Sequence, residues 1–481
     1  MQPGYTTLLT KPTGEDFYRR SGTGTAIFKV LTAAQLLNTD FADFRLMSTA
    51  TPWIGTGSAV MALPTNPFNQ NLYLFSAQIN NPNTNTTNAA DSFGISIGVS
   101  GNEITPIFVG AYTEDDASNT NTGVVHEYRA PFGRDLWSRF RTLANPNAFG
   151  TPANDLFGDS VVANATSIFA SATAEEGPTG TSANSRVYII TRSTGSLTAT
   201  INNPQPTRSG GAETVNFGTT LRLNPSGTRL VVGAPNNISS ITSTGDGVVY
   251  IYDTSGNPGG PLTTIDCPVN SYTGGENFGR SIDVSDTHII IGQEGYSANL
   301  TDSLRQGRAY IYGLATGNLV HTLENPDQFG TKAEDAFGRA VAISSQYAAV
   351  AAPGEDDDLG VNVGQVSVYD VTSGTRLYTL GPSVTRYSNL NNGGEFGTSL
   401  AIVGDRLFIS EPAKALYTDN GFTTGMIHIY EVSTGQHIQT INTTQQFGGL
   451  TLTVNSNGSM LISGNPQGLS GQGDIRIYDR L

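Results

Sequence analysis

The amino-acid sequence predicts an all-β protein built from seven four-stranded antiparallel sheets. Three observations carry this prediction. An aromatic-glycine pair occurs seven times, an apolar run into small residues or proline follows each pair, and an alternating strand rich in Val, Ile and Tyr comes next. A repeat of this length is one supersecondary unit that cannot bury its apolar faces alone. The seven copies are therefore expected to pack side by side in one architecture.

The aromatic-glycine pairs set the period of the repeat, because neighbouring pairs lie between 51 and 64 residues apart. The seven pairs are Phe93-Gly94, Phe157-Gly158, Phe217-Gly218, Phe278-Gly279, Phe337-Gly338, Phe396-Gly397 and Phe447-Gly448.

The unit Phe217–Pro268 shows how each copy is predicted to fold. Its strands are expected after Phe217, at Leu230–Pro235, at Val248–Tyr252 and at Leu262–Ile265. Alternating β-branched and aromatic residues bounded by Gly, Asn and Ser are typical of strands. Short turns containing glycine favour antiparallel hairpins between consecutive strands. Seven such meanders arranged radially make a seven-bladed β-propeller, which leaves only short, protected sheet edges.

The last copy ends at Leu481, directly after its third strand. The segment Leu72–Pro82 has the pattern of a fourth strand and lies upstream of the first Phe-Gly pair, so it is predicted to complete the last blade and close the ring. An eight-blade ring is the alternative, because Asp16–Ser21 resembles Asp335–Ala340. Seven blades are favoured, since the other landmarks are missing between Phe17 and Phe93.

The combination of Phe-Gly, Val-Gly-Ala-Pro and Gly-Val-Val-Tyr-Ile-Tyr in this unit resembles the FG-GAP repeat of integrin α-subunit propellers and of many bacterial and viral surface proteins. The resemblance covers roughly residues 70–481, and it implies an adhesion or assembly role. Family members often carry a calcium loop between the first and second strands. The equivalent loops here, such as Asn224–Thr228 and Asn455–Ser459, lack three carboxylates. No cofactor is therefore expected at the family's calcium position.

Residues 1–70 form a predicted N-terminal arm, followed by the propeller at residues 71–481. The arm contains an apolar run at Ala26–Leu31, a helix candidate at Thr32–Leu37 and a tail rich in Gly, Pro and Thr at Thr51–Pro67. Two interpretations remain open. The arm either decorates one blade or attaches the propeller to another subunit.

Composition and charge argue against several partner classes. The net charge is −15 and only 14% of the residues are charged. An acidic chain without a basic stripe is a poor partner for nucleic acid or anionic lipid. The chain has one cysteine, Cys267, so no intrachain disulfide forms, and no run has the roughly 18 apolar residues of a membrane span. The N-terminus lacks the layout of a secretory signal.

The sequence contains no motif that predicts catalysis, so the protein is expected not to be an enzyme. Zinc-binding His pairs, a Gly-x-Ser-x-Gly elbow, a Walker-type phosphate loop and the sialidase box are all absent. His126 and His428 lie in third strands and are expected to be structural. A catalytic set assembled from several blades would not be visible in the linear sequence.

Two acidic clusters in loops between second and third strands are the candidate metal sites, because adjacent carboxylates must be solvated or neutralised. A solvated loop, a calcium site and a contact to a basic partner all remain open. The candidate residues are Glu355, Asp356, Asp357 and Asp358, together with Glu114, Asp115 and Asp116.

The same loops carry Tyr112, Tyr296 and Tyr417, which are candidates for stacking on a sugar or a protein. All these loops are expected to emerge on one side of the ring, which makes that side the candidate recognition surface.

These observations predict a structural protein of a virus particle, made in the host cytoplasm and released by assembly and lysis. The Lys-poor composition, rich in Asn, Thr and Gly, is compatible with a bacteriophage capsid or tail component. The expected partners are other virion proteins and a host-surface glycan or protein. The alternative is a secreted or cell-surface adhesin that binds protein or carbohydrate through one propeller face.

Overall fold

The computed structural model divides the chain into two compact units, residues 1–75 with 480–481, and residues 76–479. The described residues are 16–20, 28–31, 44–45, 72–82, 91–101, 106–130, 136–177, 184–205, 216–237, 246–256, 258–268, 276–297, 305–326, 333–356, 363–382, 395–412, 425–443, 450–468 and 472–480. Every named element in this part of the chain is a β-strand. It contains no helix long and apolar enough to cross a membrane.

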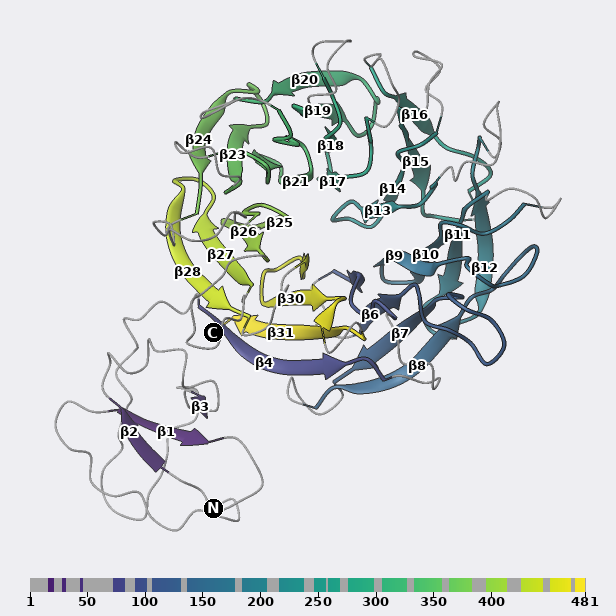
Figure 1. Ribbon diagram of the computed structural model, residues 1–481, viewed down its shortest axis with the longest axis horizontal. Helices are drawn as coiled ribbons and strands as arrows, with labels where there is room; N and C mark the ends of the chain where they lie inside the picture. Colours follow the sequence, from purple (N-terminus) through teal and green to yellow (C-terminus); the bar gives the residue numbers. More distant parts are fainter. Residues whose placement is uncertain are drawn as a thin grey trace. The chain divides into compact units, whose positions relative to one another are not determined.

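Seven four-stranded antiparallel blades form a ring (Figure 1), which confirms the predicted all-β seven-bladed propeller. Blade 1 contains β5 (Ser96–Val99), β6 (Ile107–Ala111), β7 (Val124–Arg129) and β8 (Ser138–Ala144), and blade 2 contains β9 (Phe157–Ala163), β10 (Ser167–Ala172), β11 (Arg186–Thr191) and β12 (Leu197–Asn202). Blade 3 contains β13 (Thr220–Leu223), β14 (Arg229–Ala234), β15 (Val248–Asp253) and β16 (Thr263–Asp266), and blade 4 contains β17 (Ile282–Val284), β18 (His288–Gln293), β19 (Arg308–Gly313) and β20 (Leu319–Glu324). Blade 5 contains β21 (Ala340–Ile343), β22 (Tyr347–Ala352), β23 (Gln365–Asp370) and β24 (Arg376–Leu380), and blade 6 contains β25 (Leu400–Val403), β26 (Arg406–Glu411), β27 (Met426–Glu431) and β28 (Gln436–Asn442). Blade 7 contains β29 (Thr451–Val454), β30 (Met460–Asn465), β31 (Asp474–Arg480) and β4 (Tyr73–Asn80).

The seventh blade combines strands from both ends of the chain. Its order is β29-β30-β31-β4, so the early strand β4 is the outer neighbour of the last strand (Figure 1). The Asn81 backbone N–H also donates to the Gly473 carbonyl at 3.3 Å. Blades 7 and 1 contact each other through first strands, where the Thr451 and Thr453 hydroxyls donate to carbonyls of blade 1 at 3.0 Å each. The ring therefore has no open blade at the junction of its ends.

Short strands in the N-terminal unit pair in a separate sheet, β1 (Asp16–Arg20), β2 (Phe28–Leu31) and β3 (Phe44–Arg45), in the order β2-β1-β3. Phe17 pairs within this three-stranded sheet. The eight-blade alternative is therefore wrong. The helix candidate Thr32–Leu37 lies outside the described residues.

The Phe-Gly pairs begin the blades. In the six described copies the phenylalanine is at most 1% exposed, and the glycine has a φ between 85° and 98°, which only glycine adopts without strain. The Gly279 N–H donates to the Gly292 carbonyl at 3.1 Å, which fixes the start of blade 4 to its own second strand. The phenylalanine ring is thereby held in the core between two blades.

The glycine of the second strand is needed at the junction with the next blade. A Cβ at Gly233 of blade 3 would lie 2.1 Å from the Gly279 carbonyl oxygen of blade 4. The same contact would arise at Gly464 of blade 7, where a Cβ would lie 2.1 Å from the Gly94 oxygen of blade 1. The glycine of the second strand in one blade and the glycine of the Phe-Gly pair in the next blade therefore form the two sides of one contact.

The hydrophobic core lies between adjacent blades. One cluster joins Phe169 and Ile189 of blade 2 to Phe217, Leu221 and Val232 of blade 3, all nearly fully buried. Third strands have buried side chains on both faces of the sheet, so their sequences are almost continuous apolar runs.

Candidate binding surfaces

The antiparallel order of each blade gives the ring two distinct faces. Connections from strand two to three, and from strand four to the next blade, lie on one face, which we call the loop face. Connections from strand one to two, and from three to four, lie on the other, which we call the turn face. On the loop face, the Asn154 N–H donates to the Thr120 carbonyl at 2.9 Å, so neighbouring connections support one another.

Three of the connections between blades on the loop face contain an amide–carboxyl pair whose carboxyl group is buried. The carboxyl lies two residues before the Phe-Gly pair, and the amide lies at the end of the preceding fourth strand. The Nδ2–Oδ2 distances are 2.8 Å for Asn81–Asp91, 2.6 Å for Asn145–Asp155 and 2.7 Å for Asn325–Asp335. Both partners belong to patterns that repeat in the sequence, Asn-Pro for the amide and Asp-x-Phe-Gly for the carboxyl. The sequence alone did not show that the two patterns form a pair.

Burial shifts the pKa of these carboxyls. Desolvation, reinforced by Glu114, raises the pKa of Asp91 to about 6. Desolvation also raises the pKa of Asp155 to about 7, although the Asn145 hydrogen bond opposes the shift. Where blade 4 has Glu276 in this position, desolvation and the charge of Asp246 raise its pKa to about 8. At pH 7 Glu276 is therefore mostly protonated, Asp155 is about half protonated and Asp91 is mostly ionised.

The acidic cluster of blade 1 is split between the core and the solvent. Glu114 is 1% exposed, and its Oε2 lies 2.9 Å from His126 Nε2, whose Nδ1 lies 3.0 Å from the Thr142 hydroxyl. Asp116 is exposed and accepts the Ser118 N–H at 2.6 Å, which lowers the pKa of its carboxyl. The solvated-loop interpretation therefore fits Asp116 and does not fit Glu114.

Blade 6 contains the same arrangement. Glu411 Oε2 lies 2.8 Å from His428 Nε2, and His428 Nδ1 lies 3.0 Å from the Thr440 hydroxyl. Both ring nitrogens of this buried histidine have partners, as polar groups in a core require. The same Glu-His-Thr unit therefore occurs in blades 1 and 6, on either side of blade 7, and in both it holds a third-strand histidine in the core.

The second acidic cluster begins at Glu355, which is 1% exposed, and continues at the half-buried Asp356. The Glu355 carbonyl accepts the Val363 and Gly364 N–H groups, which closes the base of the loop. Asp357 and Asp358 lie outside the described residues. Within the described ranges, no group of three or more His, Cys, Asp or Glu side chains is placed to hold a metal ion.

The candidate tyrosines differ in their surroundings. Tyr112 is half-buried, and Tyr417 lies outside the described residues. Tyr296 is 8% exposed, because the Arg308 guanidinium lies 3.7 Å above its ring and is fixed by Glu324 at 2.8 Å. Tyr296 thus differs from the exposed stacking residue expected from the sequence.

A basic and aromatic patch on the outer edge of blade 1 was missed by sequence reasoning. We call Arg129, Arg139, Phe140 and Arg141 the blade 1 patch. Phe140 is 52% exposed, and the Arg129 guanidinium stacks on its ring at 3.5 Å. Beneath them the fully buried Glu127 accepts Arg129 Nε at 2.7 Å and Arg141 Nε at 2.5 Å. One buried carboxylate therefore orders two surface guanidinium groups.

Comparison with models of protein families gives a match. The model of the FG-GAP repeat matches residues 330–369, which include the Phe337-Gly338 pair, the strands β21 and β22, and most of β23 in blade 5. No curated protein sequence matches the chain. A β-propeller that carries an FG-GAP repeat suggests a role in protein interaction or adhesion. The matched repeat and the seven-bladed ring together support assignment of the chain to the FG-GAP β-propeller family.

Proposed function

We propose that this protein is a non-enzymatic structural component of a virus particle, in which the propeller mediates assembly or attachment to the host surface. The observation that carries an interaction role is the blade 1 patch. Arginine and aromatic residues are enriched at the centres of protein interfaces, where they contribute most of the binding free energy. In a chain with a net charge of −15, such a patch favours an acidic partner surface.

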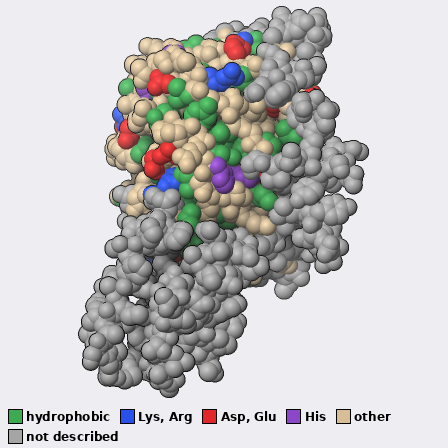
Figure 2. All heavy atoms as spheres, turned by 90° about the vertical axis from the view of Figure 1, so that its left-hand side faces the viewer, with side chains coloured by type: hydrophobic (Ala, Val, Ile, Leu, Met, Phe, Trp, Pro, Cys, Tyr) green, Lys and Arg blue, Asp and Glu red, His purple; other side chains and the backbone are tan. Residues whose placement is uncertain are grey.

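The rest of the outer rim differs from the blade 1 patch, which supports the patch as the interaction surface. Figure 2 faces the rim beside β24 and β28, where hydrophobic side chains lie among uncharged polar atoms and charged side chains are scattered. The other outer strands also expose apolar residues, which are Leu74 and Phe75 of β4, Leu197 of β12, Leu319 and Val320 of β20, and Leu377 of β24. Isolated exposed leucines are ordinary on protein surfaces. The blade 1 patch differs because the guanidinium groups of Arg129 and Arg141 lie 3.5 Å and 5.6 Å from the centre of the exposed Phe140 ring.

The proposal of a virion location rests on composition. The chain has 56 glycines and only 14% charged residues, which suits a protein built of short strands and polar turns for assembly. Quantitative mass spectrometry of purified particles of the source virus tests the proposed virion location. A fixed number of copies per particle, retained after washing in high salt, supports the proposal. Absence from the particles, with recovery from the cell surface or the medium, contradicts it.

An adhesin is the second candidate, and Phe149 on the loop face favours it. This side chain is 40% exposed, and the Arg186 guanidinium lies 4.6 Å from the centre of its ring. An exposed aromatic ring beside fixed polar groups can stack on a sugar. Under this alternative, Phe149→Ala abolishes binding to cells or glycans and leaves association with particles unchanged.

A further inference from the structure

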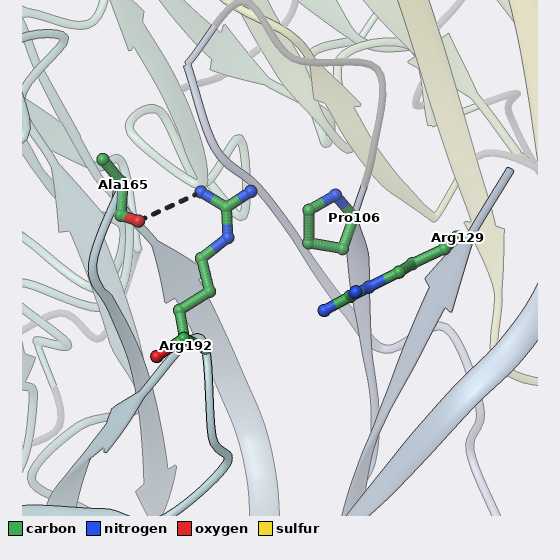
Figure 3. A pocket seen from close by; sticks show the side chains of 5 residues that line it. Pro106, Arg129, Ala165 and Arg192 are labelled. Carbon is green, nitrogen blue, oxygen red and sulfur yellow. Dashed lines mark hydrogen bonds between the residues drawn. The ribbon is translucent and has the colours of Figure 1, made fainter. Parts of the chain in front are cut away.

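The turn face carries a pocket between blades 1 and 2. It has a volume of about 310 Å³ and is lined by Pro106, Arg129, Ala165, Arg192 and Ser193. Figure 3 shows the two arginine side chains entering from opposite sides, with the ring of Pro106 between them. The two guanidinium groups come from the ends of third strands in neighbouring blades, β7 and β11, so the pocket combines residues of two blades.

The first arginine departs from the internal repeat of the ring. Arg129 directly follows the core residue Tyr128, at the end of a third strand. At the same place the third strands of blades 3, 5 and 6 end in acidic residues, Asp253, Asp370 and Glu431. Blade 7 has Asp479 at the same place, so blade 1 has a positive charge where four other blades have a negative one.

The second arginine departs from the repeat in a different way. The Arg192 backbone N–H donates to the Thr166 carbonyl at 2.8 Å, and Leu314, Val371 and Val432 make the equivalent bond in blades 4, 5 and 6 at 2.9 Å each. Those three side chains are at most 5% exposed and fill their positions with apolar atoms. In blade 2 a guanidinium replaces an apolar core side chain.

Both guanidinium groups are held in place before any ligand arrives. Arg192 Nη1 donates to the Ser100 hydroxyl at 3.0 Å and to the Asn164 carbonyl at 3.2 Å. Arg129 is fixed by Glu127 and by stacking on Phe140. A guanidinium has five N–H donors in a rigid plane, so it can keep one set of partners while presenting its charge elsewhere.

The local charge is positive in a protein that is strongly acidic overall. Arg141, which also bonds to Glu127, donates to the Arg192 carbonyl at the edge of the pocket. Three guanidinium groups and one carboxylate give these four side chains a net charge of +2. Preorganised arginines match the oxygens of carboxylate, sulfate and phosphate groups with paired hydrogen bonds.

We propose that this pocket binds an oxyanion, which is the carboxylate, sulfate or phosphate group of a small ligand. Its volume is at the lower end of the range for ligand sites, which begins at about 300 Å³, and this limits the bound part to roughly one sugar residue or one side chain. The inference goes beyond the particle role, because it holds wherever the protein is located.

Calorimetric titration of the full chain with sulfate, phosphate and glucuronate, at constant ionic strength, tests the proposal and distinguishes the sources of the anion. Glucose is the neutral control. At least one of the three anions is expected to bind saturably. Ser193→Glu adds a negative charge at an exposed lining residue, and Arg129→Gln removes one donor group. Each is expected to weaken binding about tenfold or more, as loss of a charge-assisted hydrogen bond does.

Two control variants in blade 3 make the same changes in charge on the same face of the ring. Ser255→Glu stands at the turn position of Ser193, and Arg229→Gln removes a surface arginine that pairs with Asp253 on the same face. Both controls are expected to bind the anion as the wild type does, and circular dichroism verifies that all four variants are folded. The proposal is overturned if the wild type binds none of the three anions, or if either Ser193→Glu or Arg129→Gln leaves the affinity unchanged.

Discussion

At the scale of single residues, the buried carboxyls at the blade junctions make stability depend on pH. Asp155 is fully buried, one of its oxygens accepts the Asn145 amide, and its pKa is about 7 against an ordinary value of 3.8. The folded protein thus binds this proton more tightly than the unfolded chain between pH 4 and 7. Stability linked to this group is fully present below pH 4 and is lost as the pH rises toward 7 and above.

Asp155→Asn is expected to remove this dependence, because the amide keeps the shape of the side chain and never ionises. Above pH 7 the variant should be more stable than the wild type, by on the order of 2 kcal/mol. Urea unfolding measured from pH 5 to 8 gives, for both proteins, the slope of the free energy of unfolding against pH. Equal slopes would show that Asp155 titrates alike in the folded and unfolded states.

Gly233 shows how a single atom acts at a blade junction. Gly233→Ala places a Cβ 2.1 Å from the Gly279 oxygen, so blades 3 and 4 must separate, at a cost of about 3 kcal/mol. Gly256→Ala is the matched control, because a Cβ there meets no atom within 4 Å. Thermal unfolding measures both. A Gly233→Ala protein as stable as its control would mean that the junction tolerates expansion.

At the scale of elements, the outer strand β4 determines whether the seventh blade is complete. Ile79 and Ala77 of this strand pack in the core cluster that also contains Ile475 and Ile477 of β31. The cross-strand order β31-β4 therefore joins a segment near residue 76 to one near residue 477. Long-range pairing of this kind closes the ring and covers an edge of the last sheet.

Two deletions separate β4 from the arm that precedes it. Removing residues 1–68 is expected to leave the ring folded. Removing residues 1–82 also removes β4 and exposes the edge of β31, which lowers the free energy of unfolding by about 3 to 6 kcal/mol because apolar surface is no longer buried. Chemical denaturation and limited proteolysis of both truncated proteins measure this. Equal stability of the two truncated proteins would show that β4 contributes little to closure.

The sequence predicted these elements well where the repeat is strict. The spacing of the Phe-Gly pairs and the alternation of third strands determined the number of blades and the order of their strands. The sequence could not show the surroundings of particular side chains. Glu114 reads as part of a charged loop, but its contact with His126 depends on the pairing of β6 with β7. Tyr296 reads as a loop residue, yet Arg308 from the next strand covers it.

At the scale of the whole molecule, the loop face contains the amide–carboxyl pairs of the blade junctions, while clustered arginines lie on blades 1 and 2. The blade 1 patch and the two-arginine pocket share Arg129. Neither could be predicted from one repeat, because each arises where a blade departs from the pattern of the others. A ring of near-identical blades provides the frame, and the departures supply the recognition chemistry.

Co-sedimentation with particles that lack this protein tests the account most directly. The full chain is compared with an Arg139→Ala, Phe140→Ala variant and with a Leu319→Ala, Val320→Ala control at the same outer-strand positions of blade 4. We expect saturable binding of the wild type and the control, and binding at least about tenfold weaker for the blade 1 variant, as loss of interface anchors predicts. Equal binding of all three proteins, or no binding by any of them, would contradict the proposed role of blade 1 in assembly.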